Sequence, residues 1–155
     1  MTTHFAADAR RAHAELADRL GIDGAFIDRL VDRFYTAVRA DPVLAPIFAE
    51  RIEIDDWPPH LARMKQFWSA ILRADSSFRG NPMLKHVTIP RIEEAEFERW
   101  LALFGEAVRA EATSEDASAL VTDRARAIAA SLLAGVRRYR LDQNAPQTSK
   151  GALHA

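Results

Sequence analysis

Apolar side chains recur at every third or fourth position through most of this chain, which is the spacing of one face of an α-helix. This pattern predicts helices over residues 23 to about 38, 55 to about 72, 92 to about 112 and 114 to about 140. Residues 4–20 carry few large apolar side chains and predict a weakly amphipathic leading helix. No stretch alternates between apolar and polar residues as a strand would, so the predicted fold class is all-α.

Proline and acidic residues indicate where these helices begin and end. Asp23 precedes an apolar face and can cap a helix, and Thr113-Ser114-Glu115-Asp116 indicates another helix N-terminus. Two acids followed by Pro58-Pro59 also predict a helix start, because proline is tolerated in the first turn and disrupts a helix beyond it. Asp41-Pro42 ends the helix that begins at residue 23, and residues 42–48 predict one compact turn.

The segment from Gly80 to Pro90 places a single histidine between two long helices. It follows a polar stretch, residues 74–79, that we expect to be mobile. Pro82 suits a first helical position, where its missing N–H is not needed, and Pro90 prevents the turn from continuing. His86 therefore lies on a short, rigid segment, and a ring oriented in this way is a good ligand for a transition metal or a haem iron. Taken alone, the segment favours an ordinary loop histidine, so the case for a ligand must come from the rest of the chain.

Three further residues with polar groups lie on or beside predicted apolar faces: Tyr35, His60 and Trp100. A buried Tyr35 hydroxyl would require a hydrogen-bond partner, whereas an edge position would let it reach solvent. His60 lies in the first turn of its helix, at the open end of an apolar stripe, where it faces either a pocket or water. The bulk of Trp100 is typical of core packing, although its indole N–H still requires an acceptor.

Composition narrows the possible functions. The chain has 155 residues, with 48% apolar and 28% charged, so one domain is the simplest organisation. A formal charge of −1 gives no general attraction to nucleic acid. The absence of cysteine excludes disulfides, thiolate nucleophiles and cysteine-held metal clusters. No apolar run approaches the ~20 residues that span a bilayer, and the start lacks a signal-peptide pattern, so we expect a cytoplasmic protein without membrane association.

Motifs for the common hydrolase, P-loop and dinucleotide chemistries are missing. Other residues occur in an informative order: Phe34-Tyr35, Asp41-Pro42, Pro46-Ile47-Phe48, Trp57 with His60, Phe67-Trp68, Gly80-Asn81-Pro82 with His86, and Phe97 with Trp100-Leu101 and Phe104. Together they resemble the truncated haemoglobins, and group III most closely. The resemblance extends over residues 22–139. The chain also has no Gly-Gly pair, a motif for which groups I and II are known.

The resemblance implies a truncated globin fold, a two-on-two helical sandwich around a haem. Residues 1–140 would form one domain with the leading helix, and residues 141–155 a disordered tail. His86 would be the proximal iron ligand, and Tyr35, His60 and Trp100 would line the distal side. The apolar wall would use Phe34, Phe48, Met64, Phe67, Trp68, Met83, Phe97 and Ile128, with Arg63 on a haem propionate. Because no cysteine can form a thioether, the expected cofactor is haem b.

The expected function is binding of O2 and other diatomic ligands at a polar distal pocket. Two or three donors imply tight retention, which favours redox or detoxification chemistry of nitric oxide or peroxide over bulk oxygen transport. An electron-donating reductase is the expected partner, and the protein would be a monomer or weak dimer. The alternatives are a dedicated haem enzyme, dioxygenase or peroxidase-like, with its own reductase, and a haem-free helical signalling module. Whether His60 donates a hydrogen bond or gates access stays open.

Overall fold

The computed structural model describes residues 2–75, 78–87, 89 and 92–145, and the regular structure of these residues is entirely helical. The helices are α1 (Thr2–Arg19), α2 (Gly24–Ala40), α3 (Leu44–Ala49), the 3-10 turn η1 (Ile54–Asp56), α4 (Trp57–Arg73), α5 (Pro82–Val87), α6 (Glu94–Glu111) and α7 (Glu115–Asn144). The all-α prediction is confirmed. None of the described helices is long and apolar enough to cross a membrane.

Helix starts follow the predicted local chemistry. The Asp23 carboxylate accepts a hydrogen bond from the Phe26 backbone N–H at 2.9 Å, and the Ser114 hydroxyl accepts one from Ala117 at 3.1 Å. Both bonds satisfy amide groups that the first turn of a helix leaves without partners. At α4 the two prolines lie within the first turn, where a missing N–H costs nothing.

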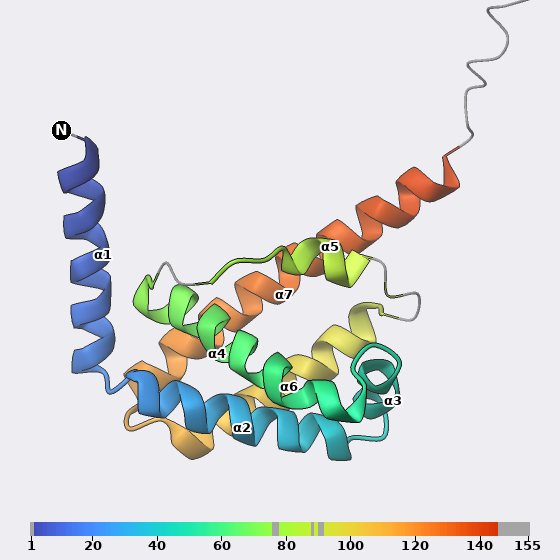
Figure 1. Cartoon of the computed structure of the whole chain (residues 1–155), viewed down its shortest axis with the longest axis horizontal. Helices are drawn as coiled ribbons and strands as arrows, with labels where there is room; N and C mark the ends of the chain where they lie inside the picture. The colour runs from blue at the N-terminus through green and yellow to red at the C-terminus, as the bar shows by residue number, and fades with distance from the viewer. Residues whose placement is uncertain (1, 76–77, 88, 90–91, 146–155) are drawn as a thin grey trace, which may run out of the picture.

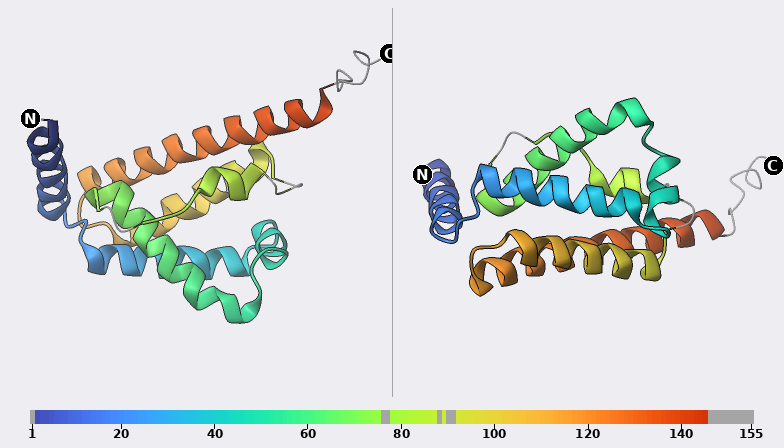
Figure 2. Two further views of the ribbon diagram at one scale, coloured as in Figure 1. Left: turned by 45° about the horizontal axis from the view of Figure 1, so that its top comes forward. Right: turned by 90° about the horizontal axis from the view of Figure 1, so that it is seen from below.

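The long helices form two pairs that pack against each other. Figure 2 shows α6 and α7 side by side in one layer, with α2 and α4 in the other, and α2 packs directly on α6. The short α5 lies against α7. This is the two-on-two arrangement that the resemblance implied.

The core between the layers is dominated by stacked aromatic rings. Phe34 of α2, Trp68 of α4 and Phe104 of α6 are each almost fully buried. The ring of Phe104 stacks on that of Trp68 with 4.7 Å between centroids and meets the edge of Phe34 at 5.2 Å. Aromatic pairs of this geometry contribute about 0.5–1.5 kcal/mol beyond their buried area. These ring contacts hold α2, α4 and α6 together.

The leading helix is present as α1, and it stands apart from the two layers (Figure 1). Its C-terminal end contacts α4 through an ion pair between Asp18 and Arg73. At the other end Phe5 is 81% exposed. Helix α1 therefore joins the core only near its C-terminal end, where Ala17 is buried.

Helix α7 ends later than the sequence predicted. It continues to Asn144, so residues 141–144 are helical, and the expectation of a disordered tail from residue 141 is wrong for them. The remainder of that tail, residues 146–155, lies outside the described residues. Helix α6 begins at Glu94, two residues later than predicted. Within the stretch 74–79 that we expected to be mobile, residues 76 and 77 also lie outside the description.

Candidate functional site

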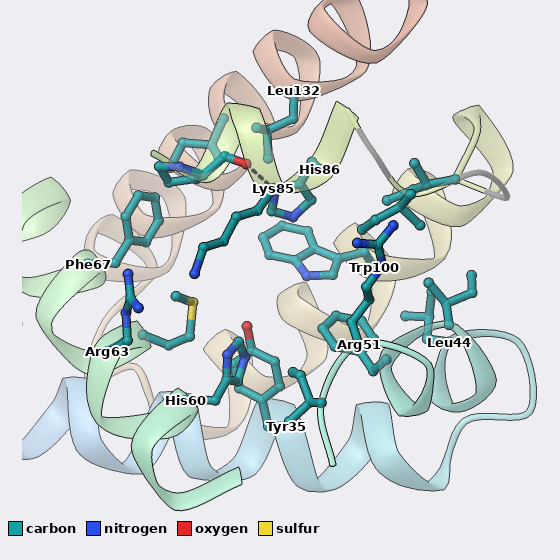
Figure 3. A pocket seen from close by; sticks show the side chains of 18 of the residues that line it. Tyr35, Leu44, Arg51, His60, Arg63, Phe67, Lys85, His86, Trp100 and Leu132 are labelled. Atoms are coloured by element: carbon teal, nitrogen blue, oxygen red, sulfur yellow. Dashed lines mark hydrogen bonds between the residues drawn. The ribbon is translucent and has the colours of Figure 1, made fainter. Parts of the chain in front are cut away.

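One large cavity of about 820 Å³ opens between the two layers (Figure 3). Its wall takes side chains from α2, α3, α4, α5, α6 and α7, and most of them are apolar. Cofactor and small-molecule sites typically enclose roughly 300–1,000 Å³ and pair an apolar lining with a few polar groups. The cavity therefore has the size and character of a cofactor site.

His86 enters the cavity from α5, whose first residue is Pro82 as the sequence predicted. Its Nδ1 lies 2.7 Å from the Pro82 carbonyl oxygen, which can only accept, so Nδ1 carries the proton and donates. The other nitrogen, Nε2, then keeps its lone pair. Burial lowers the pKa of His86 below its usual value, which favours the neutral ring. A neutral imidazole fixed in this tautomer is the form that ligates a metal. Pro90 lies outside the described residues.

Tyr35 approaches from α2 at the opposite side of the hollow, and Figure 3 shows its hydroxyl directed into the space. The residue is buried, and its ring meets those of His60 and Phe48 edge-on, with centroids 5.1 and 5.9 Å away. Burial raises the pKa of the hydroxyl above its usual value. The group therefore stays protonated at neutral pH and can donate a hydrogen bond into the cavity rather than to bulk water.

His60 also faces the cavity, from the first turn of α4. Its Nε2 is buried and has no hydrogen-bond partner among the described residues. Burial, with smaller contributions from the positive charges of Lys85 and Arg63 and from His86, lowers its pKa to about 4. A buried polar atom without a partner costs about 1–3 kcal/mol, so an occupant of the cavity that pairs with Nε2 is favoured.

Trp100 borders the same cavity from α6. Its ring stacks on Phe104, with centroids 5.1 Å apart and planes at 6°, and it meets Phe34 edge-on at 5.2 Å. Core packing thus fixes the ring, and the residue is still one of the cavity's polar groups. The two roles considered for Trp100 are compatible in this geometry.

Most of the predicted wall residues do line the cavity: Phe48, Arg63, Met64, Phe67, Trp68, Phe97 and Ile128. Phe34 does not, and its assignment to the wall is corrected. Its ring is 1% exposed and lies in the core, packed against Tyr35, Trp100 and Phe104. The side chain of Met83 lies outside the described residues.

Other lining residues were not predicted: Leu44, Ile47, Arg51, Ile52, Asp56, Pro59, Phe78, Asn81, Pro82, Lys85, Ile89, Ile92, Glu96, Ala129 and Leu132. For Leu132 a signal was available, because it follows Ile128 by one helical turn and shares its face. For Arg51 and Lys85 the sequence offered none, since neither lies on a predicted apolar face.

The residues present fit a haem. The cavity offers a mostly apolar space, a histidine whose Nε2 keeps its lone pair, and a nitrogen of His60 that has no partner among the described residues. Arg51, Arg63 and Lys85 also line it, and cations at the wall match the two carboxylates that a haem carries. His86 offers a nitrogen that can ligate a metal, and Tyr35, His60 and Trp100 add polar groups to the same cavity, which is consistent with iron held by a single protein ligand.

Comparisons with known proteins agree with this arrangement. Residues 15–133 match the model of the bacterial-like globin family. The group 3 truncated haemoglobin of Campylobacter jejuni is 34% identical over 105 residues, which are 66% of this chain and 82% of that relative. A crystal structure of a group III truncated haemoglobin from Campylobacter jejuni matches with a TM-score of 0.70 at 30% identity, covering 76% of this chain and 93% of the other.

Proposed function

Because the chain belongs to the bacterial-like globin family, and within it to the group III truncated haemoglobins, we propose that its cavity holds haem b and binds O2 and related diatomic ligands. Haem binding follows from the family. The non-covalent b type is proposed because the chain has no cysteine for thioether attachment. When bound, the haem iron supplies an open coordination position for a diatomic ligand.

One observation carries the proposal: the cavity brings together a histidine whose Nε2 could ligate a metal and hydrogen-bonding groups from three other helices. His86 offers Nε2, because its Nδ1–H is committed to the Pro82 carbonyl. Tyr35 and His60 reach the same cavity from α2 and α4, and Trp100 reaches it from α6. Four groups on four helices converge on one space, which is the arrangement expected for ligand binding next to a prosthetic group.

The polar groups favour retention of a ligand over rapid exchange. The Tyr35 hydroxyl stays protonated and so donates, and the Trp100 indole can only donate. Within a cavity of low dielectric such bonds to a polarised ligand are stronger than in water. Slow release suits redox turnover of nitric oxide or peroxide better than transport. Turnover would require electrons, so an electron-donating reductase is the proposed partner. A dedicated dioxygenase or peroxidase-like enzyme uses the same donors and is the second candidate.

The spectrum of the purified protein tests this proposal. Protein titrated with haemin should bind one equivalent, and dithionite followed by carbon monoxide should shift the Soret band as in other haem proteins. With a reductant present in air, the loaded protein should also consume nitric oxide over many turnovers. A titration without a stoichiometric end point would contradict haem binding, and a single turnover would contradict the redox role.

A further inference from the structure

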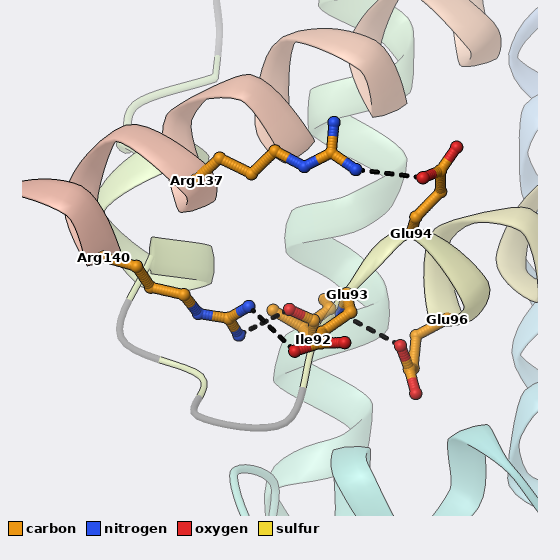
Figure 4. A network of polar contacts seen from close by, with 6 residues as sticks. All are labelled: Ile92, Glu93, Glu94, Glu96, Arg137 and Arg140. Carbon is orange, nitrogen blue, oxygen red and sulfur yellow. Dashed lines mark hydrogen bonds and ion pairs between the residues drawn. The ribbon is translucent and has the colours of Figure 1, made fainter.

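Beyond the cavity, two arginines of α7 contact the segment in which α6 begins (Figure 4). Arg140 donates from Nη2 to the Ile92 carbonyl oxygen at 2.6 Å and from Nη1 to the Glu93 carboxylate at 3.4 Å. One turn earlier, Arg137 donates to the Glu94 carboxylate at 2.9 Å. We call Arg137 and Arg140 with these contacts the α7 clasp.

The α7 clasp lies outside the part of the chain that matches the globin family. The family match ends at residue 133, whereas α7 continues to Asn144. At 1.5 Å per residue the part beyond the match adds about 16 Å of helix. The family match therefore does not account for the contacts of Arg137 and Arg140.

The residues held by the α7 clasp form part of the cavity wall. Ile92 lines the cavity and packs with Phe97 and Val136 in a small apolar cluster between α6 and α7. Glu93 caps α6 through a reciprocal capping box with Glu96, which also lines the cavity. Holding the Ile92 carbonyl and the Glu93 side chain therefore fixes the start of α6 against α7.

The two arginines do not contribute equally. The Arg137 pair with Glu94 joins side chains that are 59% and 61% exposed, and an ion pair so exposed contributes little. Arg140 is 31% exposed, and its short bond to a part-buried backbone carbonyl involves a charged donor, which makes it the stronger contact. The effect of the clasp should therefore rest mainly on Arg140.

We propose that Arg140, supported by Arg137, is a positioning residue that holds residues 92–97 against α7 and thereby slows loss of the cofactor. The inference rests on the proposed function, because it concerns how firmly the proposed haem is enclosed. Arg140 does not reach the cavity itself and acts through Ile92. The extension of α7 beyond the family match would thus be a device for cofactor retention.

The test compares Arg140→Ala with Arg138→Ala, a matched control that removes an exposed arginine two residues away on the same helix. Loaded protein is mixed with an excess of apomyoglobin, and haem transfer is followed by absorbance. The rate should rise about three- to tenfold in Arg140→Ala and by less than twofold in Arg138→Ala. Arg140→Lys, which keeps the charge and one donated bond, should recover part of the loss.

A second measurement needs no cofactor. In the haem-free protein, hydrogen exchange of the amides of residues 93–97 should be faster in Arg140→Ala than in Arg138→Ala, with amides of α2 unchanged in both. Exchanging the charges in Arg137→Glu with Glu94→Arg should leave haem transfer near the parent rate. Equal transfer rates in the two alanine variants would overturn the clasp. A parent protein that binds no haem would overturn the proposed function instead, and hydrogen exchange would still decide whether the clasp exists.

Discussion

At the scale of single residues, the site depends on side chains whose protonation and direction are fixed by burial. The Tyr35 hydroxyl is kept protonated by its surroundings, and the Trp100 ring is held by stacking on Phe104. Each is a donor from a different helix, and the two helices pack on each other. Both groups can therefore serve one ligand, provided that the ligand occupies the cavity they share.

We expect Tyr35→Phe or Trp100→Phe to accelerate oxygen release about ten- to a hundredfold, because a hydrogen bond to a strongly polarised acceptor contributes about 1.5–3 kcal/mol. Carbon monoxide is much less polarised, so its release should change far less. The double variant should depart from additivity, since the donors share one acceptor. Stopped-flow measurement of the oxygen and carbon monoxide dissociation rates in the two single variants and the double variant tests these expectations. Equal acceleration of the two gases would indicate that the substitutions merely open the pocket.

His60 should make the unfolding free energy of the haem-free chain depend on pH. Its folded pKa is about 4, below the ordinary value near 6.5, so the neutral ring is favoured by folding. The fold therefore has its full stability with respect to His60 above pH 6.5, and it loses stability as the pH falls from 6.5 through 4. With allowance for partial exposure, the parent should lose about 1–2 kcal/mol more than His60→Leu between pH 7 and pH 4.5. Urea titrations at both pH values measure the difference, and parallel losses would show that His60 titrates normally.

At the scale of the secondary-structure elements, Asp41 joins the helices α2, α3 and α6. Its carboxylate is 4% exposed and accepts hydrogen bonds from the backbone N–H groups of Val43 and Leu44, at 3.1 and 2.9 Å. It also accepts from Arg99 Nε at 2.8 Å. These contacts set α3 at the end of α2 and tie both to α6, one residue before Trp100. The Arg99 guanidinium, together with the two backbone donors, holds the pKa of Asp41 below its usual value.

Asp41→Asn should therefore lower the free energy of unfolding by about 2 kcal/mol at pH 7, because it removes the charge that strengthens these hydrogen bonds. Since the folded pKa is lowered, the contribution is present above about pH 4 and is lost as the pH falls below it. The matched control is Asp55→Asn, an exposed acid in the turn η1 that precedes α4. Chemical denaturation should give the parent and Asp55→Asn the same free energy of unfolding. The same value for Asp41→Asn would show that the contacts of Asp41 do not depend on its charge.

Local signals predicted most elements but not the length of α7. The caps at Asp23 and Ser114 and the prolines of α4 act within one turn, so sequence alone located these starts. The last turns of α7 depend in part on contacts with residues more than forty positions away, including that between Arg140 and Ile92. Such long-range contacts leave no periodic pattern, which is why residues 141–144 were expected to be disordered.

At the scale of the whole molecule, the sandwich leaves between its layers a cavity to which six helices contribute. The polar residues His86, His60, Tyr35 and Trp100 were predicted from the sequence as site candidates, and all four line this cavity. The wall was harder to predict. Phe34 and Tyr35 are neighbours on α2, and only the packing of α6 against α2 decides which of them faces the core and which the cavity.

The most direct test of the central claim, that His86 holds a haem in this cavity, is the spectrum of His86→Gly. The variant should lose haem or bind it far more weakly, because the hydrogen bond to the Pro82 carbonyl holds the His86 ring in the tautomer that ligates a metal. Added imidazole should restore a haem spectrum by occupying the space of the missing ring. His60→Ala, which removes the other cavity histidine, should retain its haem without imidazole. Undiminished haem binding in His86→Gly, with an unchanged ferrous spectrum, would contradict the account.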